Sequence, residues 1–181
     1  MKSILWAIQP YWFYFIWKGK KTIEVRKKIA KDMSGKQLFY VSKNKQSLNR
    51  IKFESEQEKA EFMRFVGKVV AGWKCSEVEE YRPCKEFYLY NWSCNSQSKV
   101  CLTDGGLWNY GNGNKLYGMH ISDLKIYDKP KELGEFKTVK VVGRYHRKNE
   151  TKFEKLQHSK RVEVKYITRP PQSWQYCEEL I

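Results

Sequence analysis

The apolar residues of the chain fall into short runs that are separated by charged or turn-forming stretches. Short runs that are unbroken, or that alternate with polar residues, are typical of strands, whereas apolar positions three or four residues apart are typical of helices. Both patterns occur, and the first is the more frequent. They predict strands over residues 3–8, 22–27, 37–41, 66–73, 116–126, 139–145 and 161–167, and short helices over residues 11–18, 56–65 and 173–180.

Residues that begin or end helices support these ranges. Pro10 suits the first position of a helix, and Gly19 is well placed to end it. Ser55 and Glu58 have the spacing of a capping box, which predicts the start of the second helix. The double proline at 170–171 leads into the third.

The elements do not alternate as βαβ units, so the predicted fold class is α+β with a closed or partly closed sheet. Residues 91–114 are rich in Asn, Ser and Gly, and we expect a long loop there with at most one helical turn after Thr103. Pro130 is expected to mark the exit from the strand before it into a turn. The length of 181 residues, with no repeat or linker, favours a single domain spanning residues 1–181.

The chain carries a strongly positive net charge of +15. Residues 1–53 hold thirteen basic and two acidic side chains, residues 54–136 hold eleven and thirteen, and residues 137–181 hold eleven and five. A surplus of this size favours a polyanionic partner such as RNA or a nucleotide. The alternative is a surface kept soluble by lysine.

The cysteines indicate a reducing compartment. The five cysteines, Cys75, Cys84, Cys94, Cys101 and Cys177, include no C-x-x-C pair. We therefore expect free thiols, with neither a disulfide framework nor a metal site.

The apolar stretch over residues 4–17 is interrupted by Gln9 and Pro10, is too short to span a bilayer and lacks a cleavage site. We therefore expect a cytoplasmic protein without membrane contact.

The stretch Gly-Lys-Lys-Thr-Ile-Glu-Val-Arg over residues 19–26 carries the most chemistry. Side chains alternate between the two faces of a strand, so Ile23 and Val25 should enter the core. The polar face then gathers Thr22, Glu24 and Arg26, with Lys21 at the turn before them. Such a face could hold an anion or a base edge; the alternative is a solvated strand on which Glu24 and Arg26 neutralise each other.

Gly19, Lys21, Glu24 and Arg26 match the G-x-K-x-x-E-x-R motif of the ASCH family in the PUA-like superfamily, and they follow a first strand and a proline-initiated helix as in that family. Two further stretches, LYGMHISDLKIYDKP at 116–130 and RPPQSWQY at 169–176, look like a branch of this family found in bacteria and their phages. The resemblance implies a PUA-like small β-barrel with flanking short helices.

The resemblance also implies a cleft, lined by the motif, that takes RNA. Some similar proteins are enzymes, either amidohydrolases that act on N4-acetylcytidine or ribonucleases. In the amidohydrolases the lysine matching Lys21 is catalytic, and a threonine stands where this chain has Glu24. Lys21 and Glu24 are therefore the candidate catalytic residues, and no cofactor or metal is implied. The candidate RNA-binding residues are Lys20, Lys21, Thr22, Glu24, Arg26, Lys27 and Trp174.

Three functions remain open at this stage. The first is an RNA- or nucleotide-binding module, in which Trp174 stacks on a base and the lysines contact phosphates. The second is a hydrolase on modified nucleosides or RNA, with Glu24 as acid or base. The third is a small interaction protein whose partner is another protein. His120 lies in an apolar strand and is expected to be a hydrogen-bonded core or rim residue rather than a general base.

Overall fold

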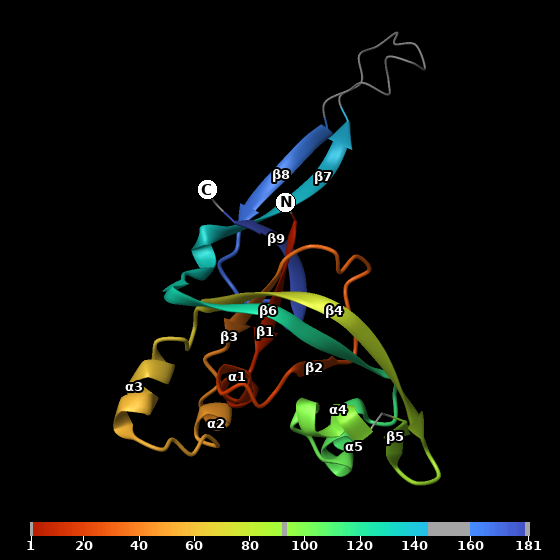
Figure 1. Ribbon diagram of the computed structural model, residues 1–181. Helices are drawn as coiled ribbons and strands as arrows, with labels where there is room; N and C mark the ends of the chain where they lie inside the picture. The colour runs from red at the N-terminus through yellow and green to blue at the C-terminus, as the bar shows by residue number, and fades with distance from the viewer. Residues whose placement is uncertain (1, 92–93, 145–159, 180–181) are drawn as a thin grey trace.

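The computed structural model describes residues 2–91, 94–144 and 160–179, and within them the chain forms an α+β fold (Figure 1). Its strands are β1 (Ser3–Ile8), β2 (Ile23–Arg26), β3 (Gln37–Val41), β4 (Val69–Cys84), β5 (Leu89–Asn91), β6 (Leu116–Lys131), β7 (Phe136–Arg144), β8 (Lys160–Tyr166) and β9 (Trp174–Glu179). Its helices are α1 (Pro10–Trp17), α2 (Lys45–Leu48), α3 (Glu56–Met63), α4 (Cys94–Val100) and α5 (Asp104–Gly111), with a short 3-10 helix at Leu133–Glu135. None of the helices in these ranges is both long enough and apolar enough to cross a membrane.

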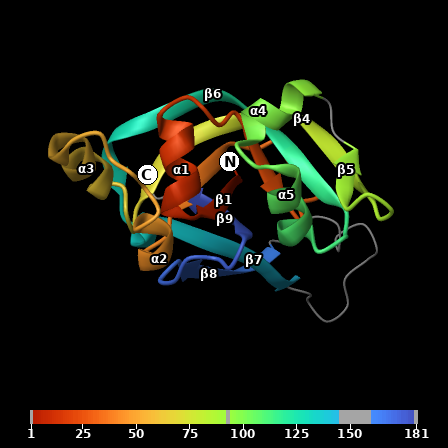
Figure 2. The ribbon, with the colours of Figure 1, turned by 90° about the horizontal axis from the view of Figure 1, so that it is seen from below.

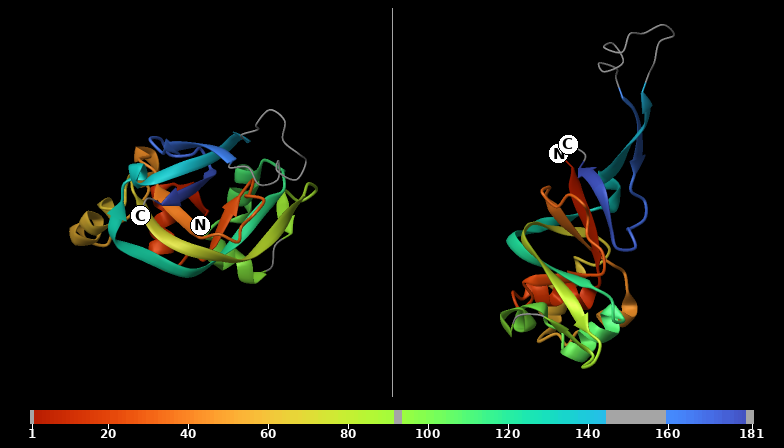
Figure 3. Two further views of the ribbon diagram at one scale, coloured as in Figure 1. Left: turned by 90° about the horizontal axis from the view of Figure 1, so that it is seen from above. Right: turned by 90° about the vertical axis from the view of Figure 1, so that its right-hand side faces the viewer.

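The strands join into one sheet in the order β2-β6-β4-β3-β1-β9-β7-β8, with β5 beside β4. β1 and β3 are parallel, and the other neighbouring strands are antiparallel. The long strands β4 and β6 curve around the molecule (Figure 3), yet β2 and β8, at the two ends of the order, do not pair. The expected barrel is therefore wrong. The sheet stays open because its β7–β8 end leaves the body as a two-stranded ribbon (Figure 1).

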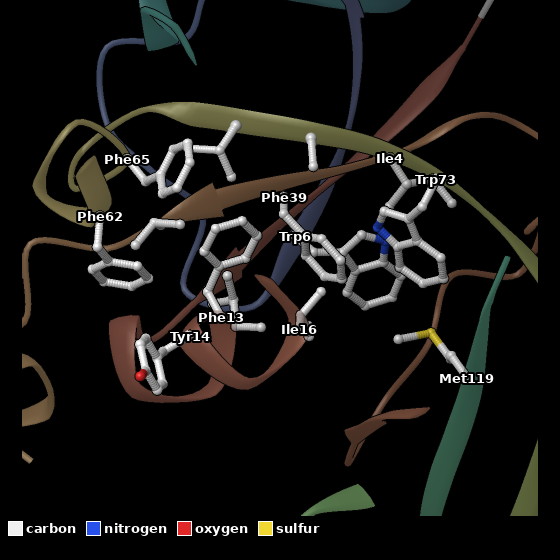
Figure 4. Close-up of a cluster of buried hydrophobic side chains, with 14 of the residues drawn as sticks. Ile4, Trp6, Phe13, Tyr14, Ile16, Phe39, Phe62, Phe65, Trp73 and Met119 are labelled. Carbon is white, nitrogen blue, oxygen red and sulfur yellow. The ribbon is translucent and has the colours of Figure 1, made fainter. Parts of the chain in front are cut away.

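An aromatic core holds α1 against the sheet (Figure 4). Trp6, Phe13, Phe39 and Trp73 are at most 1% exposed, and they come from β1, α1, β3 and β4. The rings of Phe39 and Trp73 stack with centroids 5.0 Å apart. Burial of each large apolar side chain contributes about 1.5–3 kcal/mol, so these unbroken apolar runs fix the sheet and the helix together.

The predicted capping box of α3 is present only in its Ser55 half, because the Glu58 carboxylate accepts from the backbone N–H of Glu54 and not from that of Ser55. The Ser55 hydroxyl accepts a hydrogen bond from the Glu58 backbone N–H at 3.1 Å, and the helix begins at Glu56. Phe62 and Phe65 then reach the core that surrounds Phe13. A local sequence signal therefore placed this helix correctly.

Residues 91–114 are not the long loop that we predicted, because they contain α4 and α5. Thr103 caps α5 by accepting from the Gly106 N–H at 3.1 Å. Leu107 of α5 and Val100 of α4 are fully buried in a cluster with Ile23 and Tyr81. Burial of these apolar residues against β2 and β4 offsets the poor helix propensity of the glycines and asparagines.

The other differences arise from strand pairing. Residues 174–179 form β9 and not a helix, because residues 174–177 pair with β1 over Ser3–Trp6 and residues 178–179 pair with β7. Pro130 lies inside β6, in a segment where the register with β4 shifts, so its missing N–H breaks no regular ladder. β4 and β6 run for 16 residues each, well beyond their predicted ends. Residues 145 and 180, which belonged to predicted elements, lie outside the described residues.

Candidate functional site

The motif residues Glu24 and Arg26 lie on β2, an edge strand of the sheet. β2 pairs with β6, so that Glu24 is opposite Met119 and Arg26 is opposite Tyr117. Side chains alternate along β2, so Ile23 packs in the buried cluster that contains Val100 of α4 and Leu107 of α5. Glu24 and Arg26 lie on the other face of the strand. Both charged residues are nonetheless less than 10% exposed.

Lys21 precedes this strand and is also buried, with 3% of its surface exposed. Its Nζ donates hydrogen bonds to the carbonyl oxygens of Ile23 at 2.7 Å and Val100 at 2.9 Å. The same nitrogen lies 3.5 Å from Glu24 Oε2. The end of α4 thus covers the lysine, which the sequence had placed at an open turn.

Arg26 completes a line of three charges. Its Nε lies 2.9 Å from Glu24 Oε1, and its Nη2 donates to the carbonyl oxygen of Ala7 at 2.8 Å. The guanidinium also lies over the Trp6 ring, 5.6 Å from its centroid. One carboxylate therefore separates two cations, and the backbone and the core fix the geometry of all three groups.

Burial and the neighbouring carboxylate both affect the pKa of Lys21. Burial lowers the pKa of Lys21, and the neighbouring Glu24 raises it again in part. An ammonium has three donors, and three acceptors surround this nitrogen, so the protein solvates the charged form. The lowered pKa still brings the amine closer to the neutral state than an exposed lysine would be.

The three charged residues line a cavity of about 550 Å³. Figure 2 looks at the molecule from the end where α1 and α5 lie on either side of β1 and β9. Three aromatic rings belong to its wall, Trp12 from α1, Tyr110 from α5 and Trp174 from β9. The remaining lining residues are Ala7, Ile8, Gln9, Val25, Lys27, Lys28, Leu102, Gly106, Gln172 and Ser173.

The structure brings five of the seven predicted site residues to this cavity: Lys21, Glu24, Arg26, Lys27 and Trp174. Lys20 and Thr22 are exposed and are not among its lining residues. The backbone N–H of Thr22 donates a hydrogen bond to the Lys99 carbonyl at the end of α4.

Sequence reasoning missed the part of the wall that α5 supplies. Tyr110 lies in the stretch that we predicted as a loop, and Lys27 Nζ lies 5.2 Å from the centroid of its ring. The signal was present, because Thr103 is a good N-cap residue and Leu107 has the spacing of a buried helical position. Trp12 of α1 packs against the core and also lines the cavity.

A second polar cluster joins α4 to β4 and β6. The Ser96 hydroxyl donates to both carboxylate oxygens of Glu79, at 3.0 and 2.9 Å, and His120 Nε2 is hydrogen-bonded to the same carboxylate. His120 is therefore the hydrogen-bonded rim residue that we expected. Since α4 supplies the Val100 carbonyl to Lys21, this cluster helps to position the lysine.

The described residues show no group of three or more side chains suited to hold a metal ion. Within the same ranges, Cys75, Cys84, Cys101 and Cys177 are free thiols. Burial raises the pKa of the Cys177 thiol to about 12. The side chains that line the cavity offer an amine, a carboxylate, a guanidinium and aromatic rings.

Comparisons with known proteins place the fold. No protein-family model and no curated protein sequence matches the chain. Among solved structures, ASCH from Zymomonas mobilis is 15% identical with a TM-score of 0.48, over 72% of this chain and 73% of that one. A ZmASCH variant with phenylalanine in place of a tyrosine is 14% identical with a TM-score of 0.47, over 74% and 77%. A ZmASCH variant with alanine in place of a serine is 13% identical and aligns over 96% of this chain and 87% of that one, with a TM-score of 0.53. The last of these similarities, which spans nearly the whole chain, shows that the chain has an ASCH-like fold.

Proposed function

We propose that the chain, acting as one domain, binds RNA or a nucleotide in the cavity beside β2. One observation carries the proposal. Three buried charged residues, Lys21, Glu24 and Arg26, are held in place by ion pairs and line a cavity of about 550 Å³ whose wall contains aromatic rings. Burying charged groups is costly, and a protein that needed only stability would do as well with apolar residues there. The cost is understandable if the charges serve a ligand.

The chemistry of the wall suits a nucleotide. Trp12, Tyr110 and Trp174 offer flat rings on which a base can stack. The Glu24 carboxylate can accept from an exocyclic amine, and Arg26 has N–H groups beyond those that contact Glu24 and Ala7. Lys27 and Lys28 at the same cavity are exposed and suited to phosphates. The similarity to ASCH structures supports the fold of the site and leaves its ligand to be tested.

The test uses tryptophan fluorescence and calorimetry with nucleoside monophosphates and trinucleotides. Trp174→Ala should weaken binding by about 1–3 kcal/mol, the usual contribution of one stacked base. Arg26→Gln should also weaken it, and Arg64→Gln, at an exposed position that contacts the Asp128 carbonyl, is the matched control. Equal affinity in all three variants, or no binding by the unaltered protein, would refute the proposal.

A second candidate function is hydrolysis of a modified nucleoside or of RNA. It is favoured by one observation, the buried Lys21 amine whose pKa is lowered by desolvation, as in lysines that act as bases or nucleophiles. Glu24 stands where the similar deacetylases have threonine, and it stabilises the charged amine. We therefore expect Lys21 to orient and polarise the ligand, with little release of acetate from N4-acetylcytidine. Chromatography of acetate and of cleaved RNA strands tests this candidate.

A further inference from the structure

The β7–β8 ribbon is a feature that the cavity does not use. It consists of residues 136–144 and 160–166, which pair with each other from Lys137↔Tyr166 to Arg144↔Lys160. Among the residues that the structure describes, only Phe136 and Lys137 of this ribbon also pair with β9. Beyond them the two strands leave the body of the molecule as an arm (Figure 1). Seven residue pairs at the rise of a β-strand give this arm a length of roughly 20 Å.

An isolated two-stranded ribbon gains little stability from its own pairing. This one also exposes apolar side chains, because Val164 is 48% and Tyr166 is 64% exposed. Its sequence is strongly basic. The 16 residues of the two strands include a single acidic residue, Glu163, and six basic ones, Lys137, Lys140, Arg144, Lys160, Arg161 and Lys165.

Glu163 offsets one of these six charges, because its carboxylate lies 2.9 Å from Lys165 Nζ on the same strand, and the two strands keep a surplus of five positive charges. A high density of basic residues in two paired strands favours a polyanionic partner. Lysines also protect open strand edges from pairing with other chains, and that role needs charge but no ligand. The two roles differ in whether RNA binding depends on the arm.

We propose that the β7–β8 ribbon is a second RNA-contacting surface, which binds the phosphate backbone of a single-stranded RNA outside the cavity. Tyr166 at the base of the ribbon offers a ring for stacking, as in other single-strand binders. The inference rests on the proposed function only in taking RNA as the polyanion. The cavity and the ribbon lie at opposite ends of β9, because Trp174 lines the cavity and Glu179 pairs with β7.

This separation of about six strand residues, or roughly 20 Å, makes the two sites separable by ligand length. A trinucleotide should reach the cavity alone, whereas a single strand of about 20 nucleotides should reach both surfaces. The experiment therefore compares these two RNAs in fluorescence anisotropy titrations over a range of salt concentrations.

The test variant replaces Lys140, Arg144, Arg161 and Lys165 with glutamine. The control variant carries the same change in net charge at exposed lysines around α2 and α3, namely Lys43, Lys45, Lys52 and Lys59. The single variant Lys165→Gln, at a side chain that is 69% exposed, serves if the ribbon variant does not fold. Circular dichroism and thermal unfolding check the fold of each variant.

We expect the ribbon variant to lose affinity for the long RNA on the order of tenfold, and its salt slope to fall by up to about 3, since each phosphate contact to a single strand contributes about 0.7. Its affinity for the trinucleotide should not change, and the control variant should lose neither affinity. Equal loss in the ribbon and control variants, or no loss in either, would overturn the inference. Loss in the ribbon variant while Arg26→Gln and Trp174→Ala have no effect would refute the cavity and leave the ribbon standing. Failure of the unaltered protein to bind the long RNA would overturn both.

A measurement of the protein's mass in solution at several concentrations tests whether a second copy of the chain binds the ribbon instead of RNA. If the mass in solution rises with concentration, and Val164→Thr with Tyr166→Thr abolishes the rise but leaves RNA binding unchanged, then the ribbon is an interface between two copies of the chain. That result would overturn the inference.

Discussion

Glu24→Gln tests whether the buried charges are a fixed cluster. The carboxylate lies 2.9 Å from Arg26 Nε and 3.5 Å from Lys21 Nζ, and the three side chains are 10% exposed or less. Removing its charge leaves two neighbouring cations buried without a counter-charge. Breaking a buried pair in this way typically costs about 3–5 kcal/mol. In a domain of this size that corresponds to a fall in Tm of roughly 6–20 °C.

The assay is urea unfolding followed by fluorescence of the seven tryptophans. Glu61→Gln, at an exposed position of α3, is the matched control and should change the free energy of unfolding by less than about 0.5 kcal/mol. The double variant Lys21→Met/Glu24→Gln removes one of the unpaired cations and should recover about 1–3 kcal/mol. If Glu24→Gln costs less than about 1 kcal/mol, the charges are solvated and the argument for a preorganised site is refuted.

Two further predictions concern the elements around the site. Burial raises the pKa of Glu79, but hydrogen bonds from His120 and Ser96 outweigh it, and the pKa stays below the usual glutamate value of 4.5. A carboxyl group whose pKa is lower in the folded than in the unfolded state stabilises the protein above its unfolded-state pKa, and this stabilisation is lost as the pH falls through its folded-state pKa. The difference in the free energy of unfolding between the unaltered protein and Glu79→Gln should therefore shrink below about pH 4.5 in urea titrations. A difference that stays constant with pH would contradict this. At Gly118 an added Cβ would lie 2.2 Å from the hydroxyl oxygen of the buried Tyr81, so Gly118→Ala should cost about 1–3 kcal/mol in thermal unfolding. Gly105→Ala, where nothing lies within 4 Å, is the control and should be neutral or stabilising.

Elements with strong local signals could be predicted from the residues alone. The apolar runs gave β1 and β3 their bounds, and Ser55 gave α3 its start. The motif, with strand alternation, placed Glu24 and Arg26 on one face of β2. In each case a few adjacent residues carry the whole preference through side-chain direction, capping or unbroken hydrophobicity, so that no distant partner is needed.

Other features depend on contacts between residues that are far apart in the chain. Residues 174–179 form a strand only because β1 offers an unpaired edge, and this pairing brings Trp174 to the cavity. Lys21 becomes a buried amine only because the carbonyl of Val100, 79 positions away, covers it. The free energy of such contacts comes from hydrogen bonds and burial between distant segments, and no local pattern in either segment records it.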